Sequence, residues 1–219
     1  MATRFYLPSS SAAVPVVTET SATWTVITAS NSWIRADTTK TSTVMTNFIQ
    51  AGTVGNKYLL KSFVTRTFAT ATTFTGTVSY ATSGRSTSFT NTVNLAIAIS
   101  VCNSLGVITS NLLTFGQGVF FYGTTRISDY QTSTLTTQTA NIGDFLLIEQ
   151  GIIISNASDT GRLWFGDNGT ADLSYTAQST STTQNPSIEF SDTFGASLNP
   201  WPIVVGAATN ELMKIGSGV

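Results

Sequence analysis

Apolar and polar residues alternate with a period of two along much of the chain, the pattern of strands that bury one face. Between 74 and 80, for example, Phe74, Val78 and Tyr80 alternate with threonine and serine. No stretch is strongly amphipathic as a helix. The pattern predicts about ten strands, over 23–27, 33–35, 58–67, 74–80, 93–101, 107–115, 119–122, 145–154, 162–165 and 187–190.

Turn-forming residues separate these strands, as an antiparallel all-β protein requires. The predicted turns are Gly55-Asn56, Ser83-Gly84, Gly116-Gln117-Gly118, 158–161 and 167–169. Many short strands divided in this way predict an all-β fold, an antiparallel β-sandwich of jelly-roll type.

The segment 145–154 differs from the others because apolar residues occupy both phases of the strand. Both of its faces must therefore be covered. One face belongs to the core, which favours a central position in a sheet. The other face packs against a second layer, a covering loop or a partner subunit.

Prolines occur only near the two ends of the chain, at 8 and 15 and then at 186, 200 and 202. This distribution predicts an N-terminal arm over 1–19, a sandwich domain over 20–195 and a C-terminal arm over 196–219. Phe5, Tyr6, Leu7 and Pro8 would be covered either by a groove of the sandwich itself or by a neighbouring subunit. We favour the neighbour, since 9–13 is a small-residue spacer. In the C-terminal arm, Trp201 and Ile203 are the candidate partner contacts.

The polar residues are mainly hydroxyl-bearing, because 40 threonines and 26 serines occur among 219 residues and only 10% of residues are charged. Ten Lys and Arg against eleven Asp and Glu leave no excess positive charge for a phosphate backbone, so nucleic-acid binding is not expected. A surface with so few ions permits close approach of subunits, and we expect a homo-oligomer, a trimer or a symmetric lattice. Alternatively, the threonines are there only because they form strands well.

The chain has no histidine, which excludes catalytic triads and metal sites that need one. The single cysteine, Cys102, is expected to be a small buried residue. The loop 167–172 resembles a calcium loop but lacks the spaced acidic series, so a hairpin turn is favoured there. We therefore expect no enzyme activity, no cofactor and no metal. The chain also has no apolar run near the ~18 residues of a membrane span, and no signal peptide is expected.

Four segments resemble a family of structural proteins of tailed phages and prophages. They are the opening 3–10 (TRFYLPSS), 142–151 (IGDFLLIEQG), 161–167 (GRLWFGD) and 185–191 (NPSIEFS), and their order and spacing match as well. The resemblance implies a place in a phage particle, and so a virion location. Ser187 departs from the family pattern, in which an aromatic residue often follows Asn-Pro.

Two functions follow from this resemblance and from the composition. The first is a capsid decoration or cement protein that binds the major capsid protein or another virion protein. The alternative is a tail-associated or fibre-associated module that binds a host-surface glycan. Trp24 and Trp164 lie in strand candidates with apolar neighbours, so core packing is favoured over a sugar platform for both.

Overall fold

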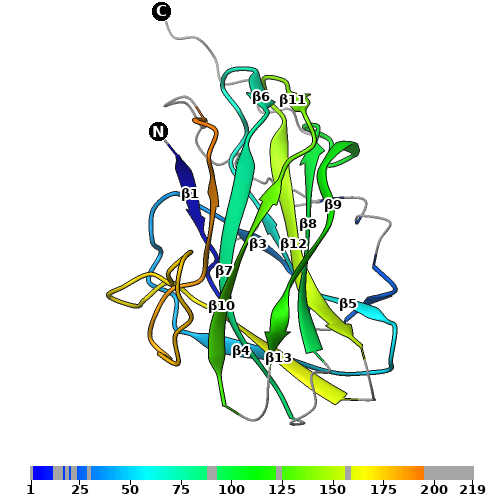
Figure 1. The fold of residues 1–219 in the computed structure, drawn as a ribbon. Coiled ribbons are helices and arrows are strands. Elements are labelled where there is room, and N and C mark those ends of the chain that lie inside the picture. Colours follow the sequence, from blue (N-terminus) through cyan, green and yellow to red (C-terminus); the bar gives the residue numbers. More distant parts are fainter. Residues whose placement is uncertain are drawn as a thin grey trace, which may run out of the picture.

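The structure is a computed structural model, and it describes residues 2–11, 17, 20, 24–28, 31–87, 93–121, 125–155 and 159–194. These residues form fourteen strands and no helix (Figure 1). The strands are β1 (Thr3–Tyr6), β2 (Val26–Ile27), β3 (Trp33–Arg35), β4 (Thr46–Gly52), β5 (Lys57–Val64), β6 (Thr72–Phe74), β7 (Thr77–Ser86), β8 (Val93–Cys102), β9 (Ile108–Phe121), β10 (Ile127–Thr134), β11 (Gln138–Ala140), β12 (Phe145–Ile154), β13 (Asp159–Phe165) and β14 (Ser187–Phe190). In the described ranges, no helix is long and apolar enough to cross a membrane.

Two six-stranded sheets make up most of the fold. The first sheet has the order β1-β14-β7-β13-β4, with β10 on the other edge of β7. The second sheet has the order β2-β5-β12-β8-β9, with β3 also on β5. All pairs are antiparallel except β2 and β3, which pair with β5 in parallel. A short β6–β11 pair lies at the upper end in Figure 1.

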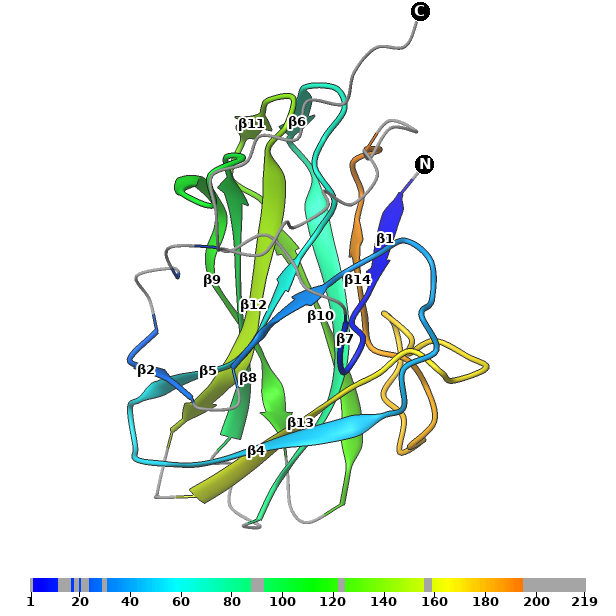
Figure 2. The same ribbon diagram turned by 180° about the vertical axis from the view of Figure 1, so that it is seen from behind.

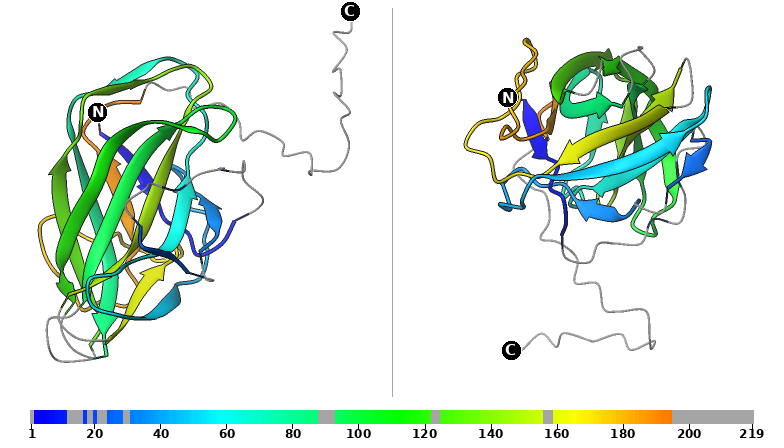
Figure 3. Two further views of the ribbon diagram at one scale, coloured as in Figure 1. Left: turned by 90° about the vertical axis from the view of Figure 1, so that its right-hand side faces the viewer. Right: turned by 90° about the horizontal axis from the view of Figure 1, so that it is seen from below.

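The main core lies between the two sheets, which confirms the predicted all-β sandwich. Val78 of β7 and Leu163 of β13 are buried in one apolar cluster with Leu60 of β5 and Ile148 of β12. The sheets are seen from behind in Figure 2 and from two further sides in Figure 3. The strand orders do not establish jelly-roll connectivity, which stays a prediction.

Strand β12 is central in the second sheet and buried along its whole length, as its apolar pattern predicts. Its inner face joins the main core. Phe145 and Leu147 on its outer face form a second cluster with Cys102 and Val17. Cys102 is fully buried, as predicted. Part of the segment before β3 therefore covers this outer face, which selects a covering loop among the predicted alternatives.

Three predicted turns were wrong because glycine also serves close packing within strands. In the turn predicted at 158–161, residues 159–161 begin β13, where a Cβ atom on Gly161 would stand 2.6 Å from a side-chain carbon of Ile152, and residue 158 lies outside the described residues. Gly116 lies inside β9, and a Cβ atom there would stand 2.9 Å from a side-chain carbon of Ile97 and from the hydroxyl of Tyr80. Ser83-Gly84 lies inside β7, where Gly84 pairs with both β10 and β13. The turn at Gly55 is confirmed, and its φ of 84° is one that glycine adopts without strain.

Candidate functional site

The N-terminal segment is part of the sandwich, which corrects the predicted arm over 1–19. Strand β1 pairs with β14, and Phe5 stands opposite Ile188. Phe5 and Leu7 are fully buried, and Pro8 is buried too. The ring of Phe5 lies 5.7 Å from that of Phe194. The sandwich itself therefore covers these side chains, and the preference for a neighbouring subunit was wrong.

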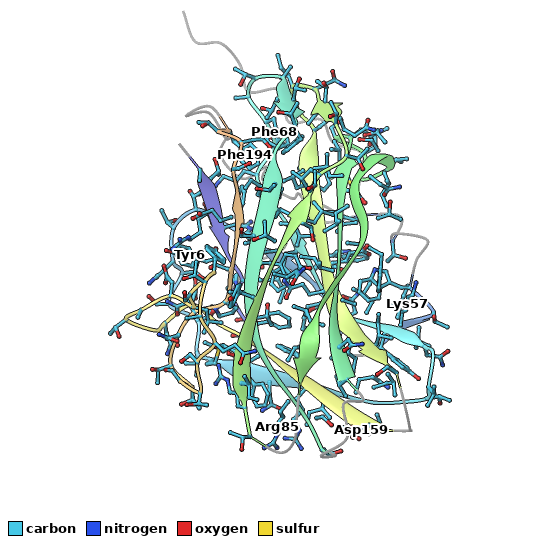
Figure 4. The ribbon with its side chains drawn as sticks, viewed as in Figure 1. Tyr6, Lys57, Phe68, Arg85, Asp159 and Phe194 are labelled. Atoms are coloured by element: carbon cyan, nitrogen blue, oxygen red, sulfur yellow. The ribbon has the colours of Figure 1, made fainter. Side chains whose placement is uncertain are left out.

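Of the other predicted contact residues, the structure describes Tyr6 but not Trp201 or Ile203. Tyr6 is half-buried, and its hydroxyl donates a hydrogen bond of 2.9 Å to Asp172. Figure 4 shows Tyr6 on the side of the molecule that carries the 166–186 connection between β13 and β14. Trp201, Ile203 and the predicted arm over 196–219 lie outside the described residues.

Two of the segments that resemble the phage family, 3–10 and 185–191, meet around one carboxylate, Asp172. Its oxygens accept hydrogen bonds from Arg4, Tyr6 and Asn185, each of 2.9 Å, and form an ion pair of 2.8 Å with Lys40. Two of these partners come from the opening segment and one from the segment 185–191. Asp172 itself lies five residues beyond the segment 161–167.

A second layer of contacts extends this network along β14. Arg4 also donates to Glu189 at 2.9 Å, and its guanidinium lies 5.1 Å from the ring centre of Tyr175. The hydroxyl of Tyr175 hydrogen-bonds that of Ser187 at 2.8 Å. Ser187, the position that departs from the family pattern, thus has a specific polar partner.

The charged groups of this network are balanced by one another. Burial alone would raise the pKa of Asp172, but hydrogen bonds from Lys40, Asn185 and Tyr6 lower it to about 2. Burial would lower the pKa of Arg4, whereas Tyr175, Glu189 and Asp172 raise it. Two cations face two anions, so the cluster is internally neutral. We assign it to stability rather than to ligand binding.

Asp167 holds the loop before β4 in place. Its carboxylate accepts from the backbone NH and the hydroxyl of both Thr41 and Thr43. Asp167 and Asp172 therefore point to separate partners, and in the part of the chain described no three acidic or cysteine residues form a group that could hold a metal. The predicted hairpin turn at 167–169 is instead the start of the long connection to β14.

A cleft of about 470 Å³ lies beside this loop. Hydroxyl and charged side chains line most of it: Ser10, Ser11, Arg35, Asp37, Thr39, Thr41, Thr43 and Arg66. Arg66 donates to one oxygen of Asp37 through Nε at 3.1 Å and Nη2 at 2.7 Å. The cleft offers hydrogen-bonding groups, but the described residues that line it include no aromatic ring on which a sugar could stack.

The outer face of the first sheet carries arginine side chains around one tryptophan. Arg162 of β13 pairs directly with Arg85 of β7, and Trp164 lies two residues further on the same face. The guanidinium carbons of Arg85 and Arg126 lie 5.8 and 5.0 Å from the ring centre of Trp164. We call these four residues the arginine face. Trp164 is thus not a core residue, contrary to the prediction.

The sequence does not reveal the arginine face as a whole. The alternation of 161–165 places Arg162 and Trp164 on one side of a strand. The pairing with Arg85 depends on the register between β13 and β7, and Arg126 lies just before β10 on the far edge of β7. Figure 4 shows Arg85 near the lower end, away from Tyr6.

Exposed apolar side chains gather at the upper end of the second sheet. Leu105 is 76% exposed on the turn after β8, and Ile142 is 69% exposed on the turn before β12. The two turns are neighbours, because Cys102 pairs with Phe145 at the ends of these strands. We call Leu105 and Ile142 the apolar tips.

The indole of Trp24 packs on the outer face of the second sheet, directly over Gly151 of β12. A Cβ atom on Gly151 would stand 2.7 Å from the indole of Trp24, and the indole is 5.8 Å from the ring of Phe115. The predicted packing role of Trp24 is thus fulfilled on the outer face of the sheet.

Comparison with known proteins shows a shared fold. No protein-family model and no curated protein sequence matches the chain. Two solved structures of a CocE/NonD family hydrolase from Staphylococcus aureus match 87% of the chain, with TM-scores of 0.51 and 0.50 and identities of 10% and 8%. The chain spans 36% of the length of these hydrolases.

This match overturns the prediction that the chain is not an enzyme. The prediction relied on the missing histidine and the single cysteine. These features rule out particular catalytic groups, but the fold itself also occurs within proteins that are hydrolases. At 10% identity the likeness concerns the fold. What the comparisons establish for this chain is an all-β, β-sandwich-like fold.

Proposed function

We propose that the chain is a structural subunit of a tailed-phage particle that binds the outside of the head shell. The observation that carries this proposal is the position of the resembling segments. Three of the four segments contribute to β1, β13 and β14. Two of the four supply side chains that donate hydrogen bonds to Asp172. The resemblance therefore lies in residues that fix the framework, which supports a shared architecture with the virion family.

The distribution of charge gives further support. Most described carboxylates are engaged within the chain, including those of Asp37, Asp167, Asp172 and Glu189. Among the described residues, the exposed side chains are mainly hydroxyl-bearing, with aliphatic side chains such as the apolar tips between them. Such groups approach another protein surface without the desolvation cost of carboxylates.

The cleft beside the loop 41–43 favours the second candidate function, a tail or fibre module that binds a host-surface glycan. Its hydroxyl groups and the Arg66–Asp37 pair are groups that hydrogen-bond sugar hydroxyls. The lack of an aromatic ring in the lining ranks this function second.

The test starts with particles produced from the genome that encodes the chain. Mass spectrometry of the purified particles reports whether the chain is a virion component. Particles that lack it are then incubated with the purified chain and imaged by electron cryo-microscopy. Added density on the head supports decoration, and density on the tail supports the alternative. Absence of the chain from the purified particles overturns both.

A further inference from the structure

Two arginines of the arginine face, Arg126 and Arg162, hold buried donors that no described residue satisfies. Nε and Nη2 of Arg126 and Nε of Arg162 are buried and make no hydrogen bond with any described residue. The remaining Nη1 of Arg126 donates to the carbonyl of Thr182 at 2.8 Å. Burial lowers the pKa of Arg126 to about 10, the direction expected when a cation loses water without gaining a carboxylate.

Like charges that face each other across a sheet are unfavourable. Arg162 and Arg85 nevertheless occupy a cross-strand pair, with Arg126 close by. Trp164 offsets part of this repulsion, because two guanidinium groups lie over its ring. The arrangement keeps positive charge in one place at a cost in stability, which is typical of a site for an external anion.

A second copy of the chain is a poor source of that anion. Seven described carboxylates have hydrogen-bonding partners in their own chain: Asp37, Asp144, Asp159, Asp167, Asp172, Glu189 and Asp192. An eighth, Glu149, is fully buried. None of these eight carboxylates is free for that role, which favours a different molecule as the source of the anion.

The surroundings favour a polypeptide over an acidic glycan. The ring of Trp164 is occupied by guanidinium groups, so it is not presented as a stacking platform for a sugar. The next residue across the sheet from Arg162 is Ile49, which is 45% exposed. Arginine, tryptophan and an exposed aliphatic side chain together are the composition of protein interfaces.

We propose that the arginine face is the docking site for an extended, carboxylate-rich segment of a partner protein. Arg126 and Arg162 donate hydrogen bonds to carboxylates of that segment, Trp164 fixes the guanidinium groups, and Ile49 packs against an apolar side chain beside the acids. The inference rests on the proposed role of the chain as a subunit that binds another protein of the particle.

The test measures binding of a fluorescein-labelled oligoglutamate peptide to the purified chain by fluorescence anisotropy. The variant Arg126→Gln/Arg162→Gln removes two charges and leaves Arg85 in place. The matched control is Lys57→Gln/Lys214→Gln, which removes the same charge elsewhere in the chain. Thermal melting checks that all three proteins are folded.

We expect the wild-type chain to bind the peptide and to lose affinity as salt rises. The arginine variant should bind about tenfold more weakly or worse, and the lysine control should stay within about twofold of the wild type. Equal weakening in both variants, or no binding by the wild-type chain, would overturn the inference. Tighter binding of heparin or of a thymidine oligonucleotide than of oligoglutamate would overturn it as well.

The peptide assay contains no particle, so its failure leaves the proposed function standing. Conversely, absence of the chain from purified particles would refute the proposed function even if the peptide bound.

Discussion

Arg4 in the first strand donates a hydrogen bond of 2.9 Å to Asp172, which follows it by 168 residues. The same arginine reaches Glu189 in the last described strand. One side chain near the start of the chain thus holds two late segments together.

Replacement of Asp172 by Asn should lower the free energy of unfolding by about 1–2 kcal/mol at pH 7. The pKa of Asp172 is lowered to about 2 in the folded chain, whereas an unfolded aspartate titrates near ~3.9. Its stabilising effect is therefore complete above about pH 4 and is lost as the pH falls toward 2. Urea unfolding at pH 7 and at pH 2.5 measures this change. The control, Asp192→Asn, removes a half-buried carboxylate that accepts longer hydrogen bonds, of 3.2 to 3.4 Å. A pH-independent difference between Asp172→Asn and the wild type would contradict the argument.

Truncation of Phe5 to Ala should cost about 3–5 kcal/mol, because the ring is fully buried against Phe190 and Phe194. The melting temperature should fall by several degrees, whatever the oligomeric state. Ser10→Ala, a change at an exposed position of the same segment, should leave it within about one degree. An unchanged melting temperature for Phe5→Ala would restore the flexible-arm interpretation.

Lys61 provides a second pH-dependent prediction, in the alkaline range. Its side chain is 4% exposed, with Nζ 2.7 Å from the hydroxyl of Ser32 and 4.1 Å from the ring centre of Phe48. Burial lowers its pKa to about 8, below the ~10.4 of an unfolded lysine. The folded chain thus loses this proton first, and the wild-type stability should rise between about pH 8 and 10.5.

The variant Lys61→Met has no amine at this position, so its stability does not change through the titration of this group. The stability of the wild type relative to Lys61→Met should therefore increase by about 1–3 kcal/mol between pH 7.5 and 10.5. Denaturant titrations at the two pH values measure it, and Lys57→Met at the start of the same strand controls for loss of a positive charge. A constant difference would show that the Lys61 amine titrates alike in both states.

The apolar tips test the expected self-association. Leu105→Ser/Ile142→Ser should change stability by less than about 1 kcal/mol, because both side chains are mainly exposed. If the tips contact a second copy, the variant should sediment as a smaller species than the wild type at equal concentration. Val44→Ser/Val54→Ser changes two other exposed aliphatic residues and serves as the control. Equal sedimentation of all three proteins would argue against a role of the tips.

Sequence patterns predict strands well where local composition decides the structure. Three predicted ranges, 33–35, 145–154 and 187–190, agree with β3, β12 and β14 to the residue. Each of them places at least one apolar side chain in the main core: Ile34 in β3, Ile148 in β12 and Ile188 in β14. By contrast, β10 is rich in polar residues and was not predicted, since its position on the edge of β7 depends on a pairing between distant segments.

Long-range pairing also explains the errors at the candidate sites. Phe5, Leu7 and Pro8 have the composition of an interaction arm, and only the pairing of β1 with β14 buries them. The arginine face depends on strand register in the same way. A single sequence contains the residues of such a site but not the alignment that brings them together.

The pairing of β1 with β14 also sets an order in which the first sheet can form during synthesis. At about 5–20 residues per second, the ribosome needs roughly 10–40 seconds to produce the chain between β1 and β14. During that interval Phe5 and Leu7 have no strand to pair with, so the first sheet cannot be completed until β14 has left the ribosome. A chain that stops before β14 would leave its N-terminal aromatic residues without their partner strand, and so open to chaperones and proteases.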